Sequence, residues 1–237
     1  MRAIWKRELQ SYFYTPLGYL YVGIFLLTGS FVFYTGNLYP RSSDMSGFFA
    51  MMSYVWMLLS PILVMRQIAG ERRQMTDQLL MTSPVSIPRI VLGKFSAAVS
   101  VLMISAFLSL PLAAITAIWG WLYPAEFITM FLGFVLQGIA LTALDFFVAS
   151  LLKNAATAFL AAFAVNLFTW LADLVMRAAQ NPLLAAIARF FSLYDRFVPF
   201  LSGQLSFANI AFYVLFSALM VFLTIRALDA RRWSELS

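Results

Sequence analysis

Residues 65–95, MRQIAGERRQMTDQLLMTSPVSIPRIVLGKF, decide how this chain must fold. They carry seven charged side chains, whereas the whole chain of 237 residues has 16 basic and 10 acidic ones. The runs before and after this segment are uncharged and long enough to cross a bilayer. Because charge is costly inside hydrocarbon, we expect the segment to lie in water between two membrane spans. Its charged residues are Arg66, Glu71, Arg72, Arg73, Asp77, Arg89 and Lys94.

The composition is that of a membrane protein. Hydrophobic residues make up 62% of the chain and charged residues 11%, against about 25% charged residues in a soluble domain. Cysteine is absent, which excludes disulfides, thiolate nucleophiles and cysteine metal sites. Histidine, the commonest general base and metal ligand, is absent too. The net charge of +6 fits cationic loops that set membrane topology, so we expect no nucleic-acid partner.

The apolar runs predict an all-α integral membrane protein with six transmembrane helices in one domain, residues 1–237. Trp5, Leu9, Tyr12 and Pro16 recur at helical spacing, with Arg2, Lys6, Arg7 and Glu8 on the other faces. This pattern predicts an interfacial N-terminal helix or a cationic flank that orients the first span. No cleavage site follows it, so we expect the first span to be retained. Residues 177–205 are too charged for a span, and we expect a short external helical hairpin there. The predicted spans are 17–34, 49–65, 95–118, 127–152, 155–176 and 207–225.

Six spans place both termini on one side, and the cationic residues say which side that is. Twelve Lys and Arg residues lie on the side of the termini and four on the other, so the positive-inside rule predicts cytoplasmic termini in the cytoplasmic (inner) membrane. The twelve are Arg2, Lys6, Arg7, Arg66, Arg72, Arg73, Arg89, Lys94, Lys153, Arg226, Arg231 and Arg232. The four are Arg41, Arg177, Arg189 and Arg196.

The cytoplasmic segment between spans two and three is predicted to hold a short helix at about residues 71–84. Thr76 or Asp77 is a suitable N-cap, Pro84 ends the helix, and Pro88 opens the next element. A helix connected at each end to a span would transmit a movement to both spans. Physical grounds alone equally allow an amphipathic loop that rests on lipid headgroups, with Leu79, Leu80 and Met81 inserted among them. An amphipathic pattern does not show whether its apolar side contacts lipid or a protein.

The residues of this segment resemble those of the ABC-2 family of ABC transporter permeases. That family shows R-x-x-A-x-E-x-x-x-G-T-x-E-x-L-L-x-x-P-V followed by I-V-x-G-K. The chain matches it with Arg66…Ala69…Glu71-Arg72-Arg73…Thr76…Leu79-Leu80…Thr82…Pro84-Val85…Ile90-Val91-Leu92-Gly93-Lys94-Phe95. The opening Trp5-Lys6-Arg7-Glu8-Leu9…Tyr12-Phe13…Thr15-Pro16-Leu17-Gly18-Tyr19 is most similar to the gliding-motility-associated branch.

The resemblance implies a permease subunit that moves cargo, by export, with energy from a separate P-loop ATPase that binds ATP and Mg. It also implies a second permease copy, identical or related. The chain is not expected to be an enzyme, because it has no G-x-x-x-x-G-K-[ST] phosphate loop. The residues implied to couple to the ATPase are Glu71, Arg72, Arg73, Thr76, Asp77, Gln78, Leu79, Leu80, Met81 and Pro84.

Three positions depart from the family pattern. Gly70 stands where an acidic residue is common, Met75 where glycine is common, and Gln78 where glutamate is common. Because acidic side chains are missing at these positions, apolar contacts of Leu79, Leu80 and Met81 with the ATPase are favoured over docking by charge.

Polar residues inside the predicted spans are pathway or interhelix candidates. Asp145, in span four, is either functional or paired with a cation or a neighbouring helix, and we favour the pairing. Asn166 and Thr169, in span five, either line a path or make interhelical hydrogen bonds. Asp173 precedes Arg177 by four residues, the favourable order for a helical ion pair.

Two other function classes stay open. An intramembrane aspartate enzyme needs two facing aspartates, but Asp145 and Asp173 are predicted near opposite membrane faces. An ion-driven secondary carrier needs no ATPase, but the chain shows no strong internal repeat. The loops are too short for a cargo-binding domain, so an apolar, amphipathic or peptide-like cargo is favoured, and force transfer to a periplasmic or extracellular accessory protein is a further role.

Overall fold

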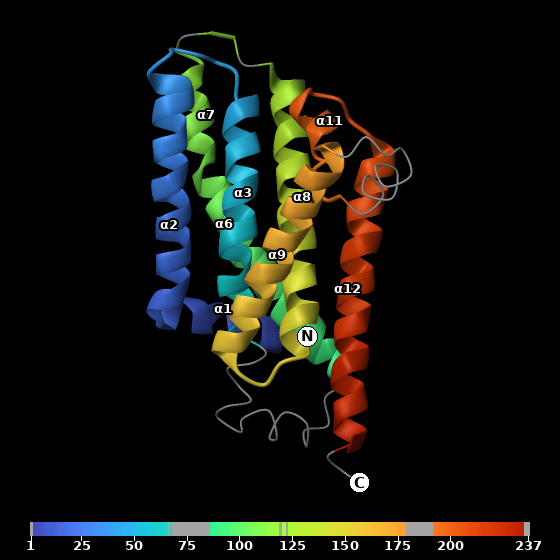
Figure 1. Ribbon diagram of the computed structural model, residues 1–237. Helices are drawn as coiled ribbons and strands as arrows, with labels where there is room; N and C mark the ends of the chain where they lie inside the picture. Colours follow the sequence, from blue (N-terminus) through green and yellow to red (C-terminus); the bar gives the residue numbers. More distant parts are fainter. Residues whose placement is uncertain are drawn as a thin grey trace.

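The computed structural model describes residues 2–65, 67, 86–118, 120–121, 123–178 and 192–234, without the side chains of residues 172–178 and 231–234. Within these ranges every regular element is a helix (Figure 1). The elements are α1 (Arg2–Tyr14), α2 (Pro16–Phe33), the π-helix η1 (Tyr34–Leu38), α3 (Ser46–Met65), α6 (Ile87–Leu108), α7 (Leu110–Thr116), α8 (Pro124–Ser150), α9 (Ala155–Ala178), α11 (Val198–Leu201) and α12 (Phe207–Ser234).

Five helical stretches are long and apolar enough to cross a membrane, so the chain is a multi-pass, all-α membrane protein. A sixth helix, α9, contributes a shorter apolar stretch, Ala155–Leu171, within the residues that the structure describes. The five stretches are Pro16–Leu38, Ser46–Met65, Ile87–Thr116, Pro124–Ser150 and Phe207–Ala230.

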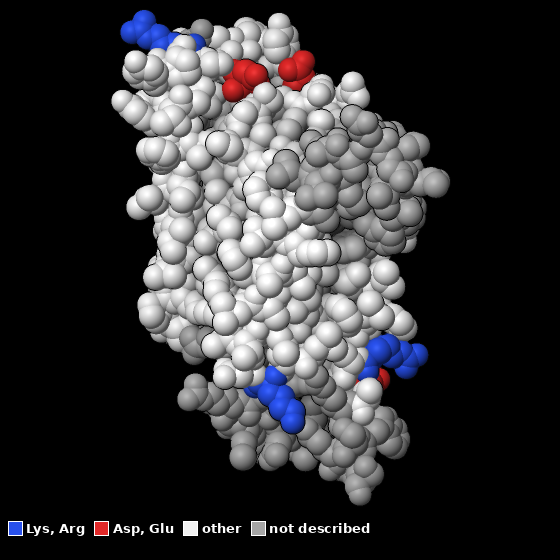
Figure 2. All heavy atoms as spheres, viewed as in Figure 1, with Lys and Arg blue, Asp and Glu red and all other residues white. Residues whose placement is uncertain are grey.

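The long helices run side by side, and α1 lies across one end of the bundle (Figure 1). We call this the α1 end; the C-terminal end of α12 lies there too, whereas α11 and the start of α12 lie at the opposite end. On the face seen in Figure 2, the charged side chains of the described residues gather near the two ends. The uncharged surface between them is suited to lipid.

Helix α8 is the centre of the bundle, because it packs against α3, α6, α9, α11 and α12. Trp56 of α3 is fully buried there. Its ring packs nearly parallel to Phe25 of α2 and to Phe134 of α8, at centroid distances of 4.5 and 4.9 Å, and these two rings are themselves 6.4 Å apart. These aromatic contacts join three helices through large apolar surfaces and favourable ring geometry.

The third predicted span begins earlier than its uncharged run. Helix α6 starts at Ile87 rather than at residue 95, with Ser86 as the N-cap and Pro88 in the first turn, where its missing N–H costs nothing. Pro88 therefore opens the element, as the sequence predicted. The helix ends at Leu108, and Ser109 separates it from α7 because Pro111 cannot continue the hydrogen-bond ladder.

A glycine contact seats α11 against α8, and it generates a prediction. A Cβ on Gly133 would lie 2.5 Å from Cγ of Phe200, whereas a Cβ on Gly23 would meet nothing within 4 Å. Gly133→Ala should therefore lower the unfolding free energy by about 1–3 kcal/mol through overpacking. Gly23→Ala is the matched control, since both glycines lie inside helices. Thermal unfolding in detergent measures both, and equal midpoints for the two variants would contradict the packing.

Candidate functional site

The predicted coupling residues lie outside the part of the chain that the structure describes. These are Glu71, Arg72, Arg73, Thr76, Asp77, Gln78, Leu79, Leu80, Met81 and Pro84. The middle of the predicted external hairpin, residues 179–191, lies outside it as well. What the structure does describe is how both ends of the 68–85 segment are held, at Gln67 after α3 and at Ser86 before α6.

A buried charged group joins these two ends. The ammonium group of Lys94, about two turns into α6, donates a 2.9 Å hydrogen bond to the carbonyl oxygen of Gln67. It also lies 3.5 Å from Oε1 of Glu8 in α1, which accepts a 2.7 Å charged hydrogen bond from Arg7. Only 5% of Lys94 and 6% of Glu8 is exposed. We call Glu8, Lys94 and the Gln67 carbonyl the cap cluster.

The cap cluster follows from the backbone chemistry of a helix end. The last carbonyl groups of α3 have no N–H partner within the helix and need donors from elsewhere. Lys94 supplies a donor to Gln67, two residues after the end of α3. The hydroxyl of Tyr12 supplies another to the carbonyl of Leu63. The end of α3 is therefore capped by side chains from both α1 and α6.

Two further contacts set the position of α1 on α6. A Cβ on Gly93 would lie 2.8 Å from Cγ2 of Ile4, so this glycine allows the close approach of the two helices. The indole N–H of Trp5 donates a 2.9 Å hydrogen bond to the hydroxyl of Ser100. Gly93 therefore allows α1 to approach α6 closely, and the neighbouring Lys94 pairs with the charge of Glu8 on α1.

The sequence placed Glu8 wrongly. It was assigned to the polar faces of the N-terminal helix, together with Arg2, Lys6 and Arg7. Glu8 instead lies three residues after Trp5 and four before Tyr12, on the buried face, because Lys94 provides a counter-charge there. The signal in the sequence was Lys94 itself: a lysine near the start of a long apolar helix needs an acidic partner.

The cap cluster predicts a large effect from removing one charge. Glu8→Gln leaves the buried Lys94 ammonium group without its carboxylate and should lower the unfolding free energy by about 3 kcal/mol. Lys6→Gln, an exposed position on the same helix, is the control and should change it little. The double variant Glu8→Gln/Lys94→Met should lose less than the sum of the single losses in thermal unfolding. Additive losses would show that the two charges do not interact.

A second polar cluster lies among α3, α8 and α9. Asp145 is fully buried, and its carboxyl group lies beside Ser60 and Asn166. The Ser60 hydroxyl and the Asn166 amide lie near its oxygens as uncharged donors, but neither reaches the geometry of a full hydrogen bond. The ion pairs of the described residues do not include Asp145, so the structure provides no described cation for it.

Asn166 repairs a helix defect. Pro61 has no N–H, so it leaves the carbonyl of Met57, four residues earlier in α3, without its usual donor. The Asn166 amide donates 3.1 Å to that carbonyl and 3.3 Å to the hydroxyl of Ser60. The interhelical hydrogen bond foreseen for Asn166 is thus present. Thr169 instead bonds to the Asn166 carbonyl, within its own helix.

This repair can be tested with a double-mutant cycle. Asn166→Leu should lower the unfolding free energy by about 1 kcal/mol in the wild type. In a Pro61→Ala background the loss should be smaller, because the N–H of the new residue can bond to the Met57 carbonyl. Thr169→Val, which removes only a hydrogen bond within α9, is the control. The same loss from Asn166→Leu in both backgrounds would contradict the repair.

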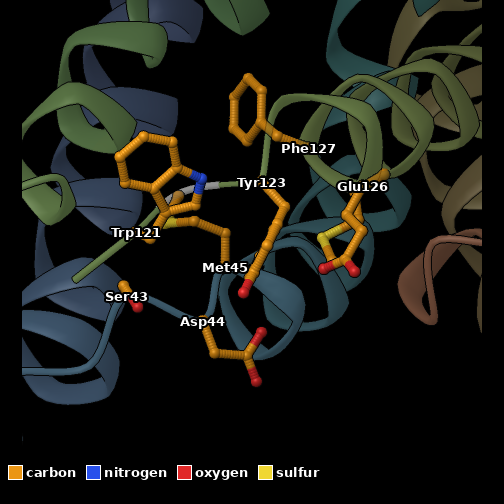
Figure 3. Close-up of a pocket in the computed structure, with 8 residues that line it drawn as sticks. Ser43, Asp44, Met45, Trp121, Tyr123, Glu126 and Phe127 are labelled. Atoms are coloured by element: carbon orange, nitrogen blue, oxygen red, sulfur yellow. The ribbon is translucent and has the colours of Figure 1, made fainter.

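A pocket of about 200 Å³ lies at the end opposite α1 (Figure 3). Its acidic residues have local structural roles. The carboxylate of Asp44 accepts hydrogen bonds from the N–H and hydroxyl of Ser46 at the start of α3, and Glu126 lies in the first turn of α8. Its rings come from Trp121, Tyr123 and Phe127, as is common where a span meets the membrane surface.

A comparison with protein-family models finds no match for this chain, and neither does a comparison with curated proteins. The side chains of Asp173 and Arg177 are outside the described part, so their pairing stays a prediction.

Proposed function

We propose that this chain is the membrane-spanning subunit of an ABC transporter of the ABC-2 type, driven by ATP hydrolysis in a separate P-loop ATPase. The cap cluster is the observation that carries the proposal. The Lys94 ammonium group bonds to Gln67, so the two ends of the segment that carries the family pattern are tied together. A force applied to that segment would therefore act on α3 and α6 together and, through Glu8, on α1 as well.

Six spans with cytoplasmic termini fit the path of the chain. Helix α8 ends at the α1 end, whereas α12 begins at the opposite end (Figure 1). The chain must cross the bundle between them, and α9 is the helix that starts this crossing. The excess of Lys and Arg on the α1 side favours the cytoplasm for that end.

The mechanism is a change in the balance between two states of the membrane subunit. Closure of the ATPase on ATP and Mg moves the helix predicted at residues 71–84. Differential contacts of that helix with the ATPase in the two states supply the driving energy. The cap cluster passes this movement to α3, α6 and α1 as one unit, and a second permease copy completes the path between the subunits.

The scarcity of charge in the described helices bears on the class of cargo. The described interior holds one buried ion pair and otherwise mainly apolar and aromatic side chains. Such an interior suits an apolar, amphipathic or peptide-like cargo better than an ion. Export is the direction that the family resemblance favours, and an accessory protein outside the membrane would receive the cargo or the force.

Docking of the ATPase through the apolar residues of the 71–84 segment gives a direct test. Leu79→Asp/Leu80→Asp should lower the amount of a P-loop ATPase that co-purifies with the tagged chain by about tenfold or more, because an apolar hot-spot contact contributes about 2 kcal/mol or more. Quantitative mass spectrometry of the purified complex measures it.

Leu205→Asp is the matched control, since Leu205 is 49% exposed and lies at the opposite end of the bundle. That variant should retain the ATPase. Full retention of the ATPase by Leu79→Asp/Leu80→Asp would exclude the docking role. Proton-driven flux in liposomes without any ATPase would instead favour an ion-driven carrier.

A further inference from the structure

A track of polar groups runs along the junction of α3, α8 and α9. On α8, Gln137 and Asp145 lie eight residues apart on one face, so the track is roughly 12 Å long. On α9, Asn166 and Thr169 lie one turn apart, and α3 adds the hydroxyl groups of Ser53 and Ser60. At the Gln137 end lies a pocket of about 20 Å³, large enough for one water molecule. It is lined by Ser53, Tyr54, Met57, Gln137, Leu141, Thr169, Trp170, Leu193 and Tyr194.

Several acceptor atoms of this track are buried without hydrogen bonds among the described residues. They are both carboxyl oxygens of Asp145, the side-chain oxygen of Asn166 and the side-chain oxygen of Gln137. A buried acceptor that has lost water and gained no donor costs about 1–3 kcal/mol. Three such side chains along one junction are acceptors to which an added proton can supply a donor.

A proton satisfies the deepest two of these groups together. A hydronium ion transfers its proton to the Asp145 carboxylate and leaves a water molecule. The carboxylic acid is uncharged, which removes the cost of an unpaired charge in an apolar interior. Its O–H is then a donor, and the Asn166 oxygen beside it is an acceptor without a donor.

The groups around Asp145 leave it without a neutralising cation. From α2, Tyr21 is the titratable side chain that interacts with it, and from α3 and α9 only the uncharged Ser60 and Asn166 do so. In the described part, the charged side chains of α6 and α12 form no ion pair with Asp145. These are Arg89, Lys94, Arg226 and Asp229.

We propose that Asp145 is a proton-binding site, filled along the α3–α8–α9 track from the pocket beside Gln137. Gln137 lies midway along α8, and Leu193 and Tyr194, which also line that pocket, come just before α11, the helix at the end opposite α1. The inference does not depend on the ATPase, because it concerns only side chains of this chain. It adds proton uptake from the far side of the membrane to the proposed transport function.

Infrared spectroscopy of the purified chain in lipid nanodiscs tests the site. At neutral pH the wild type should show the C=O stretching band of a buried carboxylic acid, shifted in heavy water. The isosteric variant Asp145→Asn should lose this band, and Asp44→Asn, an exposed carboxylate, should retain it. A wild type without the band, or an Asp145→Asn variant that keeps it, would overturn the proposal.

The entry route is tested by the rate of hydrogen–deuterium exchange of the same band. Gln137→Leu removes the polar group at the start of the track and should slow the exchange several-fold while leaving the band in place. Gln204→Leu, an exposed position outside the track, should leave the rate unchanged. An unchanged rate in Gln137→Leu would show that the proton arrives by another path.

Discussion

The bond between the Lys94 ammonium group and the Gln67 carbonyl, with Glu8 as counter-charge, is the contact on which the α1 end depends. Each partner alone would be costly, because a buried charge or an unpaired helix carbonyl is unfavourable in an apolar interior. Together they satisfy each other and fix three helices. Gly93 belongs to the same unit, since it lets α1 approach closely enough for Glu8 to reach Lys94.

The two polar clusters solve the problem of polar groups in a membrane interior in different ways. In the cap cluster, every charge meets an opposite charge or a backbone carbonyl. In the cluster at Asp145, Asn166 satisfies the carbonyl that Pro61 exposes, but the carboxyl group itself has no such partner. The first arrangement suits a rigid joint. The second leaves the carboxyl group of Asp145 able to bind and release a proton, which is why we propose a proton-binding site there.

The sequence predicted most of the helices because long apolar runs leave few alternatives in a bilayer. It also predicted Pro88 as the opening of α6, and it gave an interhelical hydrogen bond as one of two roles for Asn166. It missed the burial of Glu8, because local periodicity in α1 contains no information about Lys94, which is 86 residues away. It missed the link from Asn166 to Pro61 for the same reason: a carbonyl without a donor is a property of backbone geometry, and the helix that supplies the donor is set by tertiary packing.

We propose that the segment at residues 71–84 transmits force from an ATPase to the joint at Lys94. Site-specific photo-crosslinking in native membranes is the direct test, with the photoreactive residue at position 79 and a control at position 205. Position 79 should crosslink to a P-loop ATPase, whereas position 205 should not. Crosslinks from position 79 to lipid alone, or to a protein without a phosphate-binding loop, would contradict it.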